Sequence, residues 1–342
     1  MNRFTCHLPA LLCATAAVVT PLAASAQSNV SLYGLVDLSA GQFQTAGTAK
    51  TRRLDSGNMT TSFLGFQGKE DLGDGWLAIF KLEAFLRTDT GAMGRFDGDS
   101  FFARNSYVGL QGKYGTVTVG RNTTPLFVST LIFNAIGDSF GYSPSIRQLF
   151  TPTTGLAFFG DTGWNNSAFY GSPDVGGLTF SLIGNAAEGA AGATGKNVGG
   201  NVLYFAGPFA ATGAYQQVKN GAFGTPAGWT SQDTWQVGAS YDFTVVKLYG
   251  QYSRVKTNAT QDTESKLTSV GASVPIGLGK VLLQYGNARA DFGVSEVTNK
   301  TLTLGYDHNL SKNTDLYAVW MNDKLTAKTA GNTVATGIRL RF

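Results

Sequence analysis

Charged side chains stand two and four residues apart in one stretch of the chain, at Lys81, Glu83 and Arg87. Residues separated by an even number project from the same face of an extended strand, so these three are expected to share one face. On a wet face such charges would shape the electric field that passing ions experience. A cross-strand ion pair that only keeps the face hydrated would use the same residue types, and the sequence leaves both interpretations open.

Residues suited to covalent or metal chemistry are scarce. Both cysteines and one of the two histidines precede residue 14, which leaves His308 beside a predicted turn. One histidine cannot form a His-based metal cluster, and a chain without cysteine has no thiol nucleophile. The chain contains neither a G-x-S-x-G motif nor a Walker A motif. We therefore expect no catalytic residues, no metal, no cofactor and no enzymatic activity.

The N-terminal segment has the features of a secretory signal. Arg3 supplies a positive charge, residues 8–23 are mainly apolar, and residues 24–26 form an Ala-Ser-Ala cleavage site. Lipoprotein processing at Cys13 is disfavoured because the apolar region before that residue is too short. We therefore predict a signal peptide at 1–26 and a mature domain at 27–342. The mature domain has 25 basic and 22 acidic residues, a balance that does not indicate nucleic-acid binding.

The mature chain alternates apolar and polar residues with a period of two. The run from Trp235 to Phe243 has apolar residues at odd positions with small or polar residues between them, and the terminal run from Gly337 to Phe342 also alternates. Period two predicts strands. No apolar run reaches the ~18 residues of a transmembrane helix, so only a closed barrel could span a bilayer. Phe342 would then act in membrane assembly.

Seven tight turns divide the mature chain at a steady spacing. Each turn contains Gly, Pro, Asn or Asp and lies between two strand-like runs. Seven hairpins supply fourteen strands, and the first and last strands, at about 30–43 and 334–342, bring the number to sixteen. We therefore predict an all-β fold, a transmembrane antiparallel β-barrel of sixteen strands. The turns lie at 68–75, 112–115, 172–177, 206–209, 241–244, 275–280 and 309–313.

One connection, residues 122–159, is much longer than the others. It retains many aliphatic and aromatic side chains, which argues for a folded, functional loop rather than disorder. Folded into the barrel, it could pack its apolar side on the wall and turn Asp138, Ser139 and Arg147 towards the lumen. Shorter polar stretches, among them 45–57 and 89–100, are expected to be solvated loops.

A series of short motifs runs through the mature chain in a fixed order. They are Ser31-Leu32-Tyr33-Gly34-Leu35-Val36-Asp37, Gly68-Lys69-Glu70-Asp71-Leu72-Gly73, Ala78-Ile79-Phe80-Lys81-Leu82-Glu83, Tyr107-Val108-Gly109-Leu110, Gly115-Thr116-Val117-Thr118-Val119-Gly120-Arg121, Asn165-Asn166-Ser167, Gly176-Gly177-Leu178, Tyr241-Asp242-Phe243 and the terminal Phe342. In this order they resemble the general diffusion porins of Gram-negative outer membranes, in their trimeric proteobacterial branch. The match covers essentially all of residues 27–342, and the ordered set is more specific than any single motif.

The resemblance implies a homotrimeric channel whose third loop folds inward and narrows the lumen, with acidic loop groups opposite a basic wall. Arg104 and Arg121 fall where wall arginines are expected, and Asp138 falls where the loop carries its acidic tip. Asp37 is expected to face the lumen from the first strand, and Arg147 to lie on the loop. Outer-membrane lipid and lipopolysaccharide would surround the barrel.

The chain departs from the family pattern at several wall positions. It has Phe63 where the family usually has an arginine, and Gly163, Trp164 and Phe169 where basic residues are common. These departures predict a thinner basic wall and a wider or more aromatic pore.

The sequence thus predicts a passive outer-membrane channel for small hydrophilic solutes and ions. Two alternatives stay open. One is a substrate-selective channel in which Phe63 and Phe169 help to line a slot. The other is a secreted β-rich adhesin that needs no pore.

Overall fold

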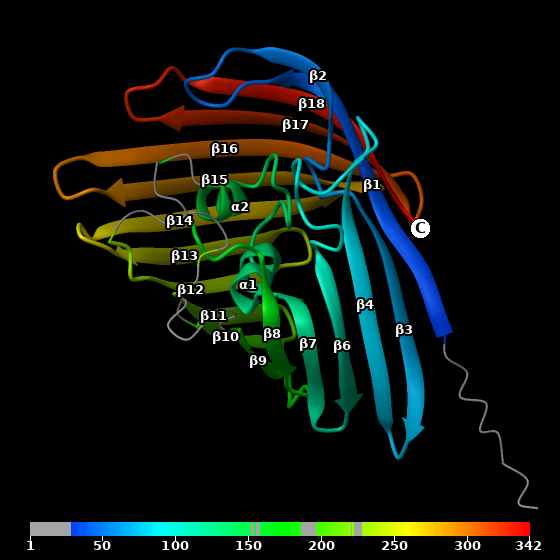
Figure 1. Cartoon of the computed structure of the whole chain (residues 1–342). Helices are drawn as coiled ribbons and strands as arrows, with labels where there is room; N and C mark the ends of the chain where they lie inside the picture. Colours follow the sequence, from blue (N-terminus) through cyan, green and yellow to red (C-terminus); the bar gives the residue numbers. More distant parts are fainter. Residues whose placement is uncertain (1–28, 152–153, 155–157, 186–195, 220, 222–227) are drawn as a thin grey trace, which may run out of the picture.

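The computed structural model describes residues 29–151, 154, 158–185, 196–219, 221 and 228–342. The expected signal peptide at 1–26 lies outside these residues. Sixteen long strands, each antiparallel to its neighbours, close into a barrel in which β1 pairs with β18 (Figure 1). The predicted sixteen-stranded barrel is confirmed. Its strands are β1 (Asn29–Phe43), β3 (Phe63–Gly73), β4 (Trp76–Arg87), β6 (Asn105–Gly112), β7 (Gly115–Thr123), β8 (Gly163–Gly171), β9 (Leu178–Asn185), β10 (Val198–Ala206), β11 (Phe209–Val218), β12 (Ser231–Asp242), β13 (Lys247–Asn258), β14 (Thr263–Ile276), β15 (Gly279–Asp291), β16 (Glu296–Asn309), β17 (Thr314–Leu325) and β18 (Gly331–Arg341).

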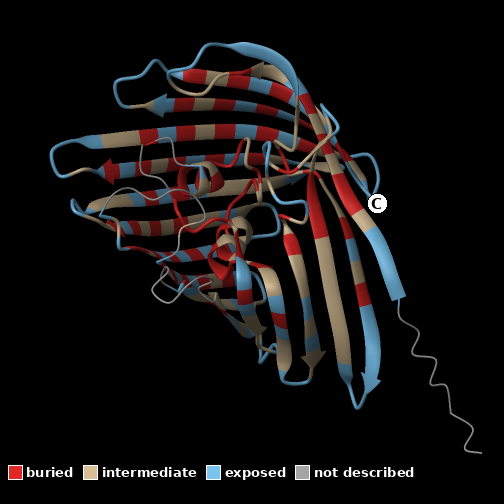
Figure 2. Ribbon diagram, viewed as in Figure 1, coloured by how far each residue is buried: buried red, intermediate tan, exposed pale blue. Residues whose placement is uncertain are grey.

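Alternation along the strands determines which face is buried (Figure 2). In β12 the side chains of Gln236 and Ser240 are buried, whereas those of Val237 and Tyr241 are exposed on the other face. This is the reverse of a water-soluble protein, in which apolar side chains are buried. A barrel in lipid requires it, because apolar groups face hydrocarbon and polar groups face the interior. The seven predicted hairpin turns are all confirmed. In the turn between β3 and β4, Gly73 and Gly75 have positive φ angles of 85° and 78°, a conformation that glycine adopts without steric cost.

The chain ends meet where the barrel closes. Residues 35–42 of β1 pair with β18, from Leu35 opposite Arg341 to Gln42 opposite Val334. Phe342 extends this ladder, because its backbone N–H donates to the Gly34 carbonyl at 3.1 Å and its carbonyl accepts from the Gly34 N–H at 3.0 Å. The Phe342 ring lies over Gly34, where a Cβ atom would be only 2.6 Å from the ring. The C-terminus is therefore built into the seam (Figure 1).

The second barrel strand is interrupted. Two short strands, β2 (Thr51–Ser56) and β5 (Ala92–Met93), add to the sheet beside β1 and β4. The expectation of a solvated loop over 45–57 is wrong for Thr51–Ser56, because these residues pair with Leu38–Phe43 of β1. Residues 57–62 then leave the ladder before β3 begins.

The third loop carries two short helices, α1 (Pro125–Ile132) and α2 (Pro144–Phe150). Thr124 and Ser143 cap their N-termini, and each helix begins with proline, whose fixed φ suits that position. Both helices lie within the barrel (Figure 1), with α1 against β10–β12 and α2 against β14–β16. Among the described residues, no helix is long and apolar enough to cross a membrane.

Candidate pore constriction

The third loop leaves a cavity of about 1050 Å³ between itself and the wall on the side of β2 and β4. Its charged lining is strongly unbalanced, with six basic residues against two acidic ones. Five of the basic residues come from β2, β4 and the segment between β4 and β6. The basic residues are Arg53, Lys81, Arg87, Arg95, Arg104 and Arg147, and the acidic residues are Asp138 and Asp161.

Arg104 lines the cavity, and contacts with two residues of the barrel wall fix its side chain. Its Nη1 lies 2.6 Å from Glu83 Oε2, and its guanidinium group lies 4.1 Å from the centre of the Phe63 ring. Glu83 is only 1% exposed and also accepts hydrogen bonds from Tyr33 and Asn105, each at 2.6 Å. Glu83 therefore holds Arg104 in place and does not itself line the cavity. Phe63, which stands where the family usually has another arginine, thus supports Arg104.

Arg121 is not among the residues that line the cavity. Its guanidinium group donates to the Ala103 carbonyl, to Asn165 Oδ1 at 2.8 Å and to Asp161 Oδ2 at 3.0 Å. Arg95 binds the other oxygen of Asp161 at 2.8 Å. Burial opposes ionisation of Asp161, but Arg95 and Arg121 outweigh it and hold the pKa of this carboxyl below its usual range. Arg121, which was expected to face the solute path, is therefore held by these partners and does not line this cavity.

Asp37 is fully buried, so the expectation that it lines the lumen is wrong. One carboxylate oxygen accepts from the backbone N–H groups of Met59 and Thr60 at 2.7 and 2.9 Å, and the other accepts from the Tyr317 hydroxyl at 2.6 Å. A carboxylate with both oxygens occupied by fixed donors is a structural anchor. Asp37 therefore fixes the segment that interrupts the second strand.

That interrupting segment in turn holds the tip of the third loop. The Asn58 carbonyl accepts from the Ser139 hydroxyl at 2.6 Å and from the Gly141 N–H at 2.9 Å. Thr60 donates to Asp138 at 3.1 Å. Burial raises the pKa of Asp138, and the opposing effects of Thr60 and of Arg104 and Arg339 do not cancel that increase.

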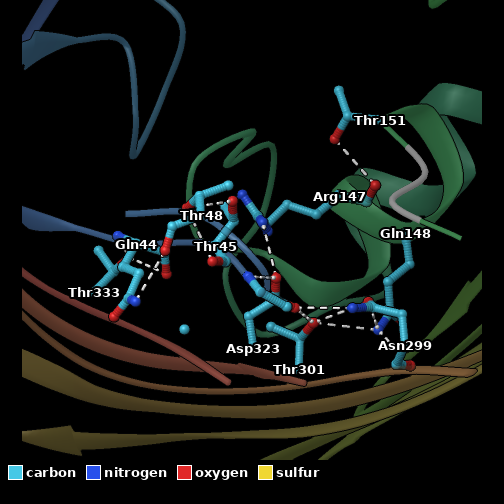
Figure 3. A network of polar contacts seen from close by, with 12 residues as sticks. Gln44, Thr45, Thr48, Arg147, Gln148, Thr151, Asn299, Thr301, Asp323 and Thr333 are labelled. Atoms are coloured by element: carbon cyan, nitrogen blue, oxygen red, sulfur yellow. Dashed lines mark hydrogen bonds and ion pairs between the residues drawn. The ribbon is translucent and has the colours of Figure 1, made fainter. Parts of the chain in front are cut away.

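Arg147 and its neighbour Gln148 tie α2 to β16 and β17 (Figure 3). Arg147 donates to the Gly141 carbonyl at 3.2 Å, and its Nη2 lies 3.7 Å from Asp323 Oδ2. Gln148 Nε2 donates to Asn299 Oδ1 at 2.8 Å. Arg147 lies on the loop, in α2, and is among the residues that line the cavity.

Lys81 also lines the cavity, whereas two of the unusual aromatic residues do not. Lys81 Nζ lies 5.8 Å from the centre of the Tyr33 ring. Trp164 is buried beside Phe159 and Ile183, and Phe169 packs against the same cluster. Phe63 and Phe169 therefore do not line a slot in the way that the selective-channel alternative required.

Sequence reasoning missed two cavity arginines, Arg53 and Arg95, as site residues. Arg53 lies 4.4 Å from the Phe43 ring centre, and Arg95 lies 5.6 Å from that of Phe85. Arg87 pairs with Asp97 at 2.6 Å. Arg87, which the sequence places on one strand face with Lys81, also lines the cavity. Arg53 and Arg95 were assigned to solvated loops, so they gave no signal in the sequence.

A closed sixteen-stranded barrel, apolar outside and narrowed by an inward loop, defines a diffusion channel of the outer membrane. The chain belongs to the Gram-negative porin family, whose model matches residues 13–328. It is similar to outer membrane porin protein 32 of Delftia acidovorans, with 34% identity over 319 residues that cover 90% of this chain and 87% of that protein. An outer membrane porin protein of Bordetella pertussis is 27% identical over 383 residues, covering 94% and 96% of the two chains.

Comparison with solved structures agrees. An anion-selective porin from Comamonas acidovorans superposes with a TM-score of 0.77 at 30% identity, covering 92% of this chain and 100% of that one. The protein therefore forms a water-filled channel in the Gram-negative outer membrane, through which small hydrophilic solutes and ions diffuse passively. Because the members of this family are channels, the alternative of a secreted adhesin is rejected.

Proposed function

We propose that this porin prefers anions and that its selectivity arises in the cavity beside the third loop. The observation that carries the proposal is the charge of the lining, with six basic residues against two acidic ones. A water-filled passage with one sign of charge on its wall raises the local concentration of ions of the opposite sign. The solved relative described as an anion-selective porin supports the same preference.

The contacts that position the basic side chains strengthen this proposal. Arg53, Arg95 and Arg104 each lie over an aromatic ring, which positions the guanidinium group without neutralising it. Carboxylates partly balance these charges. Arg53 pairs with Asp55 at 2.8 Å, Arg95 with Asp99 and Asp161, and Arg104 with Glu83. Lys81 has no carboxylate within 4.0 Å in the described part of the chain, so its full charge contributes to the field.

The test is the reversal potential of single channels in a potassium chloride gradient. We expect chloride to be the more permeant ion, and we expect Arg53→Ala to lower the chloride-to-potassium permeability ratio. The matched control is Arg52→Ala, because Arg52 precedes Arg53 on β2 but does not line the cavity. A preference for potassium in the unmodified protein would contradict the proposal, as would equal effects of the two substitutions.

The assembled state is a second part of the proposal. We expect a homotrimer, with lipid and outer-leaflet lipopolysaccharide around the remaining wall, and a signal peptide at 1–26. Exposed apolar side chains such as Val237, Leu248 and Leu304 support contact with lipid or a second subunit. A trimer that resists detergent and dissociates on heating would agree with this, and a monomer in native membranes would contradict it.

A further inference from the structure

The third loop presents a row of aromatic rings to the cavity. Phe127 lies 5.9 Å from Phe140 and 5.1 Å from Phe150, and Phe150 lies 4.9 Å from Phe158, measured between ring centres. All four rings line the cavity. They come from both helices of the loop and from the segments that follow each helix.

Packing of the loop does not account for all of this row. The loop attaches to the wall through a different set of side chains, since Leu126, Leu149 and Phe158 form a buried cluster with Ala214 and Val255. Phe127 and Phe140 lie outside that cluster and are only half-buried. Large apolar side chains left open to a wet passage are unfavourable unless something covers them. Their position points to a solute with an apolar part.

Arginine side chains elsewhere in the cavity lining could bind a negatively charged group of such a solute. Arg147 precedes Phe150 by three residues on α2, so both project from neighbouring positions of one helix face. Across the cavity, Arg53, Arg95 and Arg104 are held over rings of the wall. An aromatic row and a basic wall in one cavity together match a molecule with an apolar body and an anionic end.

We propose that, among small anions, this channel binds aromatic carboxylates most strongly, with the ring against the Phe127–Phe140–Phe150 row and the carboxylate towards the arginines. This inference rests on the proposed anion preference and deepens it. A sugar would also stack on aromatic rings, but each of its hydroxyl groups both donates and accepts hydrogen bonds, so a sugar needs acceptors as well as donors. The charged groups here are mainly cations, which favour a carboxylate.

The experiment measures how added solutes reduce the chloride current through single channels in a planar bilayer. Three probes separate charge from apolar contact: benzoate has both, acetate has only the charge, and benzamide has only the ring. Contact of one ring face with the row predicts a half-blocking concentration of benzoate about tenfold below that of acetate. Pairing of the carboxylate with the arginines predicts one about tenfold below that of benzamide. Equal block by benzoate and acetate, or by benzoate and benzamide, would overturn the inference.

Two variants assign the effect to the row. Phe127→Ala should remove most of the advantage of benzoate over acetate, and Phe127→Leu, which keeps an apolar side chain, should remove less. The control is Phe101→Ala, because Phe101 is exposed and does not line the cavity. If Phe101→Ala weakens benzoate block as much as Phe127→Ala, the row is not the binding surface.

The reversal potential distinguishes failure of this inference from failure of the proposed function. Anion preference without discrimination between benzoate and acetate would refute only the aromatic carboxylate site. A preference for potassium would refute the proposed function itself, and the inference with it.

Discussion

The position of each charged side chain in this channel depends on the residues that it contacts. Arg104 and Arg121 both fall where wall arginines are expected, yet only Arg104 lines the cavity. Glu83 and Phe63 fix Arg104 from behind, whereas Asp161, Asn165 and a backbone carbonyl take up the donors of Arg121. Two arginines of equal charge thus have different positions because their partners differ.

The two acidic groups of the cavity are expected to titrate in different pH ranges. Burial raises the pKa of Asp138, while Arg95 and Arg121 hold that of Asp161 down. As pH falls from 7 towards the ordinary range of aspartate near ~4, Asp138 therefore takes up a proton first and the cavity loses one negative charge. We predict that the chloride-to-potassium permeability ratio rises over this interval.

Asp138→Asn should remove this pH dependence and give the higher ratio already at pH 7. Reversal potentials recorded between pH 7 and about 4.5 measure the effect. Asp74→Asn is the matched control, since Asp74 lies in the exposed turn between β3 and β4. An unchanged pH profile in Asp138→Asn would show that another group causes the change.

At the scale of elements, the third loop is held by buried amides and hydroxyl groups of the wall. Gln148 binds Asn299 and Thr301, and the Gln251 amide donates to the Thr130 carbonyl at 2.7 Å. Hydrogen bonds of this kind fix a backbone that lacks a neighbouring strand. The constriction therefore derives its rigidity from side chains of β13 and β16 as well as from apolar packing.

Gln148→Ala should loosen α2, because it removes the hydrogen bonds that the Gln148 amide donates to buried acceptors on β15 and β16. We expect a loss of about 1–3 kcal/mol of stability and larger fluctuations of the open-channel current. Thermal unfolding in detergent and single-channel recording measure the two effects. The control is Gln67→Ala, since Gln67 of β3 makes no side-chain hydrogen bond among the described residues. Equal effects of both substitutions would contradict a specific tether.

The sequence predicted elements better than their contacts. Period-two alternation and turn residues predicted the sixteen strands and seven turns, because each depends on neighbours in sequence. Alternation also placed Glu83 and Asp37 on the inner face. It could not reveal that Tyr33, Asn105 and Tyr317 cover them, since those partners lie far away along the chain. For the same reason Arg53, in a stretch assigned as loop, was missed.

At the scale of the molecule, the barrel depends on closure between its first and last strands. Phe342 contributes two backbone hydrogen bonds to Gly34 and a ring that covers it. Phe342→Ser should lower the amount of assembled protein in the outer membrane several-fold, whereas the conductance of the channels that do assemble should stay unchanged. Phe342→Tyr keeps the ring and is the control. Normal outer-membrane levels of Phe342→Ser would refute this role.

The pairing of Leu35 with Arg341 has a consequence for biogenesis. The two halves of the seam are separated by almost the entire polypeptide, so the ring cannot be completed until the last residues have been synthesised and delivered. Contacts between such distant segments form slowly. Cells that make this protein must therefore protect an open sheet, with unpaired edges and exposed apolar side chains, from aggregation until the final strand is available.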